Sequence, residues 1–185
     1  MTTSYRPSLV ALALLALVLS GCGSAASRHD DADVAFASGM VPHHRQAVQM
    51  SDVLLAKTGV DPDVVALATT IKAEQAPEID RMTGWLTAWG APAPTDGGGM
   101  GGMGGVAGMG DGMMTSEQLE ALGSAQGRQA QTLFLQGMTA HHEGAVAMAN
   151  AELTQGENAD AKALAQSIVT SQQAEIDQMR QLLTR

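Results

Sequence analysis

An internal repeat narrows the folds open to this chain more than any other property of its sequence. The block Phe-x-x-Gly-Met-x-x-His-His-x-x-Ala-Val-x-Met begins at Phe36 and recurs at Phe134, at an offset of 98 residues. A second block, Ile-x-x-x-Gln-x-x-Glu-Ile-Asp-x-Met, begins at Ile71 and recurs at Ile168, at an offset of 97 residues. Two matched blocks in the same order indicate a duplication. We therefore expect a fold built from two similar halves.

Both blocks have the spacing of amphipathic helices. On a helix, five side chains of the first block fall within an arc of about 80°, and four of the second within about 60°. These are Phe36, Met40, His43, Ala47, Met50, Ile71, Gln75, Glu78 and Met82. Their counterparts are Phe134, Met138, His141, Ala145, Met148, Ile168, Gln172, Glu175 and Met179. We expect each half to direct these side chains toward a shared apolar interior, with His44 and His142 at its edge.

Capping residues divide the two halves into four helical segments. Asp61 before Pro62 is a strong helix start, and Thr115 or Ser116, then Asn158, are suited to begin the third and fourth segments. Aromatic residues make up only 3% of the chain. The core must therefore use Ala, Leu, Val and Met, which favour close-packed helices. The sequence predicts an all-α four-helix bundle built from two duplicated αα-hairpins.

A glycine-rich segment, residues 91–115, separates the two halves. Each Gly costs a helix about 1 kcal/mol relative to Ala, so we expect a flexible linker between hairpins at residues 31–90 and 116–185. The two hairpins together form one domain, residues 31–185. Because a polar linker has no core to fill, we interpret its methionines as candidates for capturing a soft metal, with low-complexity drift as the alternative. They are Met100, Met103, Met109, Met113 and Met114.

The amino terminus has the pattern of an export signal. Arg6 precedes an apolar run, residues 9–19, which is shorter than the roughly 20 residues that span a bilayer. The sequence Leu-Ser-Gly-Cys ends at Cys22 and resembles the bacterial lipobox, in which the cysteine is lipid-modified. We expect residues 1–21 to be a lipoprotein signal peptide and residues 22–30 a tether. Lipidated Cys22 would then anchor the exported chain to the outer side of the cytoplasmic membrane or to an outer membrane.

Charge and cysteine content exclude several classes of function. The formal net charge of −9 argues against a nucleic-acid partner, because neutralising phosphates requires clustered Lys and Arg. Cys22 is the only cysteine, so its use as an anchor excludes disulfides and thiolate catalysis. The sequence also offers no nucleophile or phosphate-binding loop that would support other catalysis.

Four of the five histidines stand in two His-His pairs. A single core histidine is often structural, but a helix does not need two adjacent histidines to fill a core, and unpaired buried polar groups are costly. Thioether with imidazole suits Cu(I), whereas carboxylate with imidazole suits Zn, Fe or Mn. The candidate metal ligands are His43, His44, Met40, Met50, Met82, His141, His142, Met138, Met148 and Met179. Gln75, Glu78, Gln172 and Glu175 are candidate partners that orient the imidazoles.

These motifs resemble a family of exported bacterial proteins, domain of unknown function family 305, which is often grouped as ferritin-like. Its pattern is Phe-x-x-x-Met-x-x-His-His-x-x-Ala, followed by Ile-x-x-x-Gln-x-x-Glu-Ile-x-x-Met, and the resemblance covers about Val34 to Leu183. It implies an up-down four-helix bundle and, since some members are described as copper-binding, a role in copper handling. Ferritin di-metal sites use Glu-x-x-His, which is absent here. Glu143 follows His142 directly, and its counterpart is Arg45, so the resemblance gives little support to oxidase chemistry.

The sequence leaves three hypotheses. The first is a non-enzymatic, membrane-anchored lipoprotein that binds copper as Cu(I) and buffers or delivers the ion, with an unidentified protein as metal donor or acceptor. The second is a metal-dependent enzyme with a His and carboxylate site for Zn, Fe or Mn. The third is a structural or partner-binding envelope module without a metal, in which the His-Glu pairs are fixtures of the core.

Overall fold

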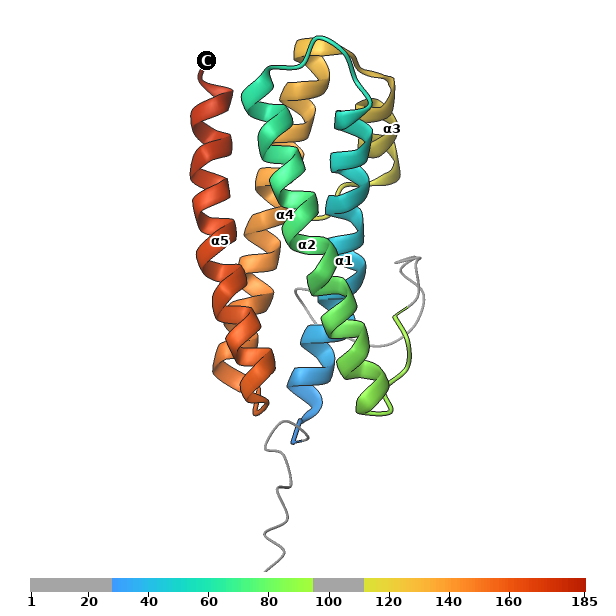
Figure 1. Cartoon of the computed structure of the whole chain (residues 1–185), viewed down its shortest axis with the longest axis vertical. Coiled ribbons are helices and arrows are strands. Elements are labelled where there is room, and N and C mark those ends of the chain that lie inside the picture. Colours follow the sequence, from blue (N-terminus) through green and yellow to red (C-terminus); the bar gives the residue numbers. More distant parts are fainter. Residues whose placement is uncertain (1–27, 95–111) are drawn as a thin grey trace, which may run out of the picture.

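A computed structural model describes residues 28–94 and 112–185, which contain five helices and no strand (Figure 1). The helices are α1 (Asp31–Leu55), α2 (Pro62–Ala88), α3 (Ser116–Ser124), α4 (Gly127–Gln155) and α5 (Ala159–Leu183). The all-α class and the helical bundle predicted from the repeat are confirmed. The predicted signal peptide, Cys22, Met100, Met103 and Met109 lie outside the described residues.

The four long helices pack as two antiparallel hairpins. α1 pairs with α2, α4 pairs with α5, and the two hairpins meet mainly where α1 packs against α4. In the view of Figure 1, α1 and α5 run upward while α2 and α4 run downward. Because α1 and α4 are equivalent in the repeat and antiparallel, corresponding residues approach one another only where the two helices cross.

Helix starts follow the capping residues expected from the sequence. Asp61, Thr115 and Asn158 each accept hydrogen bonds from the first backbone N–H groups of α2, α3 and α5. Asp30 caps α1 in the same way and forms a reciprocal capping box with Asp33. These bonds satisfy amide donors that have no partner inside the helix.

The third predicted segment is wrong in one respect, because it is two helices rather than one. α3 ends at Ser124, and the next two residues, Ala125 and Gln126, are extended. α4 then begins at Gly127, which has a φ of +51°. Glycine and serine at the end of α3 favour this break. The break lets α3 fold back over α1 and α4 and bury Leu122.

Two apolar clusters fill the bundle, one toward each end. The lower cluster, placed as in Figure 1, includes Phe36, Met40, Met82, Leu86, Ala145, Ala149, Leu164 and Ile168. The upper cluster includes Met50, Leu54, Leu67, Ile71, Phe134, Met138, Ile176, Met179 and Leu182. Burying each Phe, Met, Leu or Ile side chain of these clusters stabilises the fold by about 1.5–3 kcal/mol.

A polar layer separates the two clusters on every long helix. On α1 and α4 it consists of the two His-His pairs, and on α2 and α5 of a Gln and a Glu one turn apart. We call it the middle layer, and its members are His43, His44, Gln75, Glu78, His141, His142, Gln172 and Glu175. Eight polar side chains gathered at one level between two apolar clusters are candidates for chemistry rather than packing.

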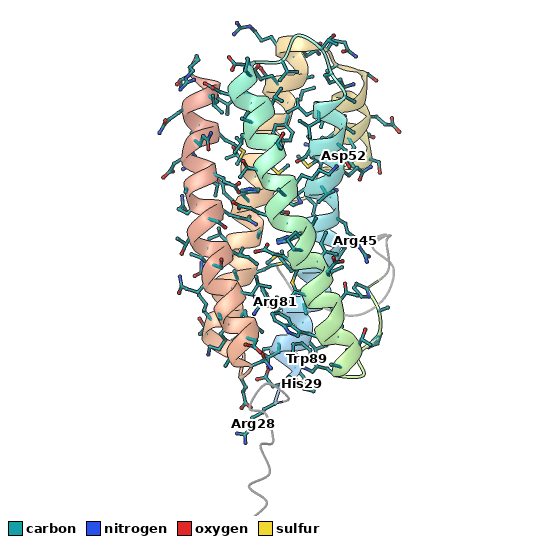
Figure 2. All side chains as sticks on the ribbon, in the orientation of Figure 1. Arg28, His29, Arg45, Asp52, Arg81 and Trp89 are labelled. Carbon is teal, nitrogen blue, oxygen red and sulfur yellow. The ribbon has the colours of Figure 1, made fainter. Side chains whose placement is uncertain are left out.

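The lower end of the bundle carries a stack of aromatic rings. The fifth histidine, His29, stacks on Trp89 with ring centroids 4.8 Å apart, and Trp89 stacks on Trp85 at 5.9 Å. The guanidinium of Arg81 lies 5.0 Å from the ring centre of Trp85. Figure 2 shows His29, Trp89 and Arg81 at this end. None of the described helices is long and apolar enough to cross a membrane.

Candidate metal centre

The middle layer is centred on two imidazoles from different halves of the repeat. His43 of α1 and His141 of α4 have ring centroids only 3.6 Å apart, with the rings tilted by 38°. All four paired histidines have no exposed surface. The crossing of α1 and α4 therefore brings the equivalent histidines of the duplication into contact.

The second histidine of each pair contacts a glutamate of its own hairpin. His44 Nε2 lies 2.8 Å from Glu78 Oε2, and His142 Nε2 lies 2.8 Å from Glu175 Oε2. A carboxylate that accepts the Nε2–H bond favours the tautomer whose Nδ1 carries the lone pair. Nδ1 of both His44 and His142 has no hydrogen-bond partner within the described residues. We call each of these His-Glu pairs a dyad. Each dyad leaves one imidazole nitrogen able to bind a metal.

Burial favours the neutral imidazole of His141, at the centre of this layer. It is the largest cause that lowers the pKa of His141 well below its usual value of 6.5, and the imidazoles of His43, His142 and His44 lower it further. A neutral imidazole keeps a lone pair for a metal at neutral pH. On α2, burial first and then the charges of Glu175 and Glu78 raise the pKa of Glu74. These three carboxyl groups therefore lie near one another on the α2 and α5 side of the layer.

The methionines of the two halves are mixed between the two apolar clusters. Met50 lies in the upper cluster with Met138 and Met179 of the other half. Met40 and Met82 lie in the lower cluster, against which half-buried Met148 packs. Sequence spacing could not reveal this exchange, because it follows from the antiparallel crossing of α1 and α4. Thioethers from both halves thus flank the histidines above and below.

Two buried glutamines complete the layer. Gln75 and Gln172 are each 2% exposed, and neither amide atom of Gln75 has a hydrogen-bond partner in the described part of the chain. An unsatisfied buried polar group costs about 1–3 kcal/mol. Within residues 28–94 and 112–185, no three His, Cys, Asp or Glu side chains are arranged to hold a metal ion. The donors that do meet in the middle layer are imidazoles, with thioethers on either side.

Two of the linker methionines lie on the bundle. Met114 is 8% exposed and belongs to the upper cluster, so the expectation that the linker methionines have no core to fill is wrong for this residue. Its backbone accepts a hydrogen bond from Gln46 Nε2 at 3.0 Å and donates one to Gln46 Oε1 at 2.7 Å. The repeat gave no signal for Gln46, because the equivalent position in the second half is Gly144. Met113 is half-buried.

Comparisons with known proteins agree with this architecture. The sequence model of the family described as domain of unknown function (DUF305) matches residues 33–183. No curated protein gives a significant match. Among solved structures, a DUF305 protein of Streptomyces coelicolor, provisionally described as secreted, is 37% identical, with a TM-score of 0.70 over 83% of this chain and 92% of that one.

Structures of a second relative, CopM, contain metal. Its Cu(I)-bound form is 32% identical, with a TM-score of 0.66 over 82% of this chain and 95% of that one. Its Cu(II)-bound form is 33% identical, with a TM-score of 0.67 over the same shares. CopM has also been solved with silver. The family resemblance expected from the motifs is confirmed.

Proposed function

This chain belongs to the DUF305 family, and we propose that it binds copper, as Cu(I), in its middle layer and buffers or delivers the ion at the cell envelope. The observation that carries this proposal is the contact between His43 and His141, 3.6 Å apart between two methionine-bearing clusters. Imidazole and thioether together form a soft donor set, which suits Cu(I). CopM, with its copper-bound and silver-bound forms, supports the same chemistry.

The residues have distinct roles in this proposal. His43 and His141 are the central ligands, and His44 and His142 offer Nδ1 because Nε2 is engaged by a glutamate. Glu78 and Glu175 orient those rings. The nearest thioethers in sequence are Met40, three residues before His43, and Met138, three before His141. Met50, Met82, Met148 and Met179 supply further sulfur ligands.

The two halves share one centre under this proposal. Independent sites, one in each hairpin, would keep the equivalent histidines apart, whereas His43 and His141 are in contact. Loss of either ring should therefore impair the ligand set of both halves. The centre binds and releases an ion, and no nucleophile or general base is required of the protein.

The cell envelope is the proposed place of action. Lipidation of Cys22, the only cysteine, would attach the bundle to a membrane outside the cytoplasm. The S. coelicolor relative described provisionally as secreted supports export. A partner that donates or accepts the ion would then be another envelope protein.

Metal selectivity tests the proposal directly. The purified chain is titrated anaerobically with Cu(I) against a chromogenic chelator, and separately with Zn(II) and Mn(II). We expect tight Cu(I) binding that is lost when all four paired histidines are replaced by Leu. The matched control is His29→Leu, since His29 stacks on Trp89 outside the middle layer. Retention of Zn(II) or Mn(II) with indifference to Cu(I) would instead support a His and carboxylate enzyme.

A further inference from the structure

A short segment, residues 112–115, crosses the seam between α1 and α4; we call it the strap. The Gln46 side-chain amide forms hydrogen bonds with both the carbonyl oxygen and the N–H of Met114. Gln46 is 8% exposed and follows His43 by three residues on α1. The strap is therefore fixed to α1 one helical turn from the central histidine.

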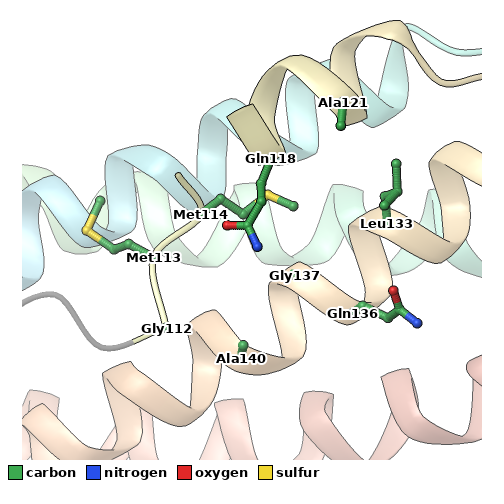
Figure 3. Close-up of a pocket in the computed structure, with 9 residues that line it drawn as sticks. All are labelled: Gly112, Met113, Met114, Gln118, Ala121, Leu133, Gln136, Gly137 and Ala140. Carbon is green, nitrogen blue, oxygen red and sulfur yellow. The ribbon is translucent and has the colours of Figure 1, made fainter. Parts of the chain in front are cut away.

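The Met114 side chain reaches α4 one turn before His141. A Cβ added at Gly137 would lie 2.4 Å from Met114 Cε and 3.1 Å from its sulfur, so the thioether rests directly on this glycine. Gly137 precedes His141 by four residues, which places it one turn away on the same face. Figure 3 shows Met114 extending toward Gly137, whereas Met113 extends the other way. Met114 thus lies one turn from His43 through its backbone and one turn from His141 through its side chain.

The strap backbone also touches α4 beside His141. Gly112 has a φ of +91°, and a Cβ there would lie 2.1 Å from the Ala140 carbonyl oxygen and 3.1 Å from His141 Cα. A groove of about 280 Å³ runs along this contact, lined by the strap, by Gln118 and by Gln136 and Gly137 of α4. The four paired histidines have no exposed surface. An ion from solvent can therefore reach them only by passing between the residues that bury them.

We propose that a soft monovalent cation reaches the middle layer along this seam, with the Met114 sulfur as its first buried ligand. This inference rests on the proposed function. A neutral thioether binds Cu(I) or Ag(I) without bringing a second charge into the core. Met50, Met138 and Met179 lie in the same apolar cluster as Met114. They offer the next sulfur ligands on the way to His43 and His141.

Loading kinetics test the route separately from affinity. Stopped-flow spectroscopy follows transfer of Cu(I) from a chromogenic chelator to the full chain, and then its removal by excess chelator. Met114→Leu keeps the apolar packing but removes the sulfur. We expect loading and removal both to slow about tenfold, with the equilibrium constant unchanged within about twofold. Glu117→Gln, at an exposed position of α3 just after the strap, is the control and should load like the unaltered chain.

Two further variants keep the test decisive. Gln46→Leu frees the strap and should speed both loading and removal. Glu74→Gln alters the carboxyl-lined side between α2 and α5, and slowing by this variant but not by Met114→Leu would overturn the route. Unchanged rates in Met114→Leu would overturn it as well, as would a loss of affinity at an unchanged loading rate. If the unaltered chain fails to bind Cu(I), both the proposed function and the route are wrong. If it binds Cu(I) normally but the variants show the loading rates just described as contradicting the route, only the route is wrong.

Discussion

The two hairpins are alike in the middle layer and unlike at their ends. In each, the second histidine of the pair lies 2.8 Å from a glutamate of the partner helix. At the upper end, Gln131 Oε1 accepts a hydrogen bond from the backbone N–H of Asp61 at 3.1 Å. At the lower end the equivalent bond goes from Asn158 N–H to the carboxylate of Asp33 at 2.9 Å. The bond is retained, but its acceptor carries a charge at one end only.

The lower end contains a second acid where the upper end has an apolar side chain. Glu152 is 1% exposed, and its counterpart in the repeat is Leu54, which is fully buried in the upper cluster. Many combinations of side chains can close a helical turn, so the ends were free to diverge after the duplication. The middle layer had no such freedom if both halves must present the same donors to one centre.

The pH dependence of stability should separate the two ends most strongly. Burial is the largest cause that raises the pKa of Glu152, from 4.5 to about 8, and the neighbouring Asp33 raises it further. The folded chain therefore holds this proton more tightly than the unfolded chain. The stability that the proton contributes is complete below pH 4.5 and is lost as pH rises through about 8. The loss is on the order of a few kcal/mol.

Urea unfolding at pH 5, 7 and 9 measures this dependence. Glu152→Gln keeps a hydrogen-bond donor for Asp33 without an ionisable proton and should flatten the profile between those values. Glu143→Gln, an exposed acid on the same helix, is the control and should leave the profile unchanged. A profile that stays steep in Glu152→Gln would place the titrating group elsewhere.

The glycines that connect the two helices within each hairpin should differ in their tolerance of a side chain. A Cβ at Gly156 would lie 2.3 Å from Glu152 Oε1, so Gly156→Ala must displace a buried carboxyl group. We expect a loss of about 2 kcal/mol in unfolding free energy. A Cβ at the equivalent Gly59 meets nothing closer than Gly127 Cα at 3.7 Å, but its φ is +73°. Gly59→Ala should therefore cost about 1 kcal/mol through backbone strain alone.

Chemical denaturation of both variants and of a double variant tests this assignment. Adding Gly156→Ala to a Glu152→Ala background should cost little, because the obstructing carboxyl group is gone. Equal losses in both backgrounds would mean that the glycine is needed for another reason.

The smallest difference should be found in the middle layer itself. Glu78→Gln and Glu175→Gln each weaken the acceptor that orients an imidazole, so each should lower Cu(I) affinity by about tenfold. Glu175 is the more buried of the two, with a side chain 10% exposed against 20% for Glu78. We expect a slightly larger loss for Glu175→Gln in an anaerobic competition titration. A loss confined to one variant would show that only one half contributes its dyad.

Much of this arrangement could be predicted from the sequence, because it is local. Helical spacing placed His43, Gln75, Glu78 and Met82 on inward faces, and Asp61 and Asn158 marked helix starts through their own side chains. Both rules depend only on residues within a few positions of one another.

The remainder depends on contacts distant in sequence. The meeting of His43 with His141 follows from the crossing of α1 and α4, which no spacing within one block encodes. The position of Met114 on the bundle depends on its hydrogen bonds with Gln46, which lies 68 residues earlier in the chain. The sequence does not reveal the break before α4, because the glycine and serine there are compatible with either a weak helix or a turn.

The central claim, one copper centre shared by both halves, is tested most directly by Cu(I) competition titration of His43→Leu, His141→Leu and the double variant. We expect each single variant to lose about a hundredfold in affinity and the double variant to lose little more. Independent sites predict a different result, in which each single variant keeps one site of undiminished affinity and only the double variant loses both.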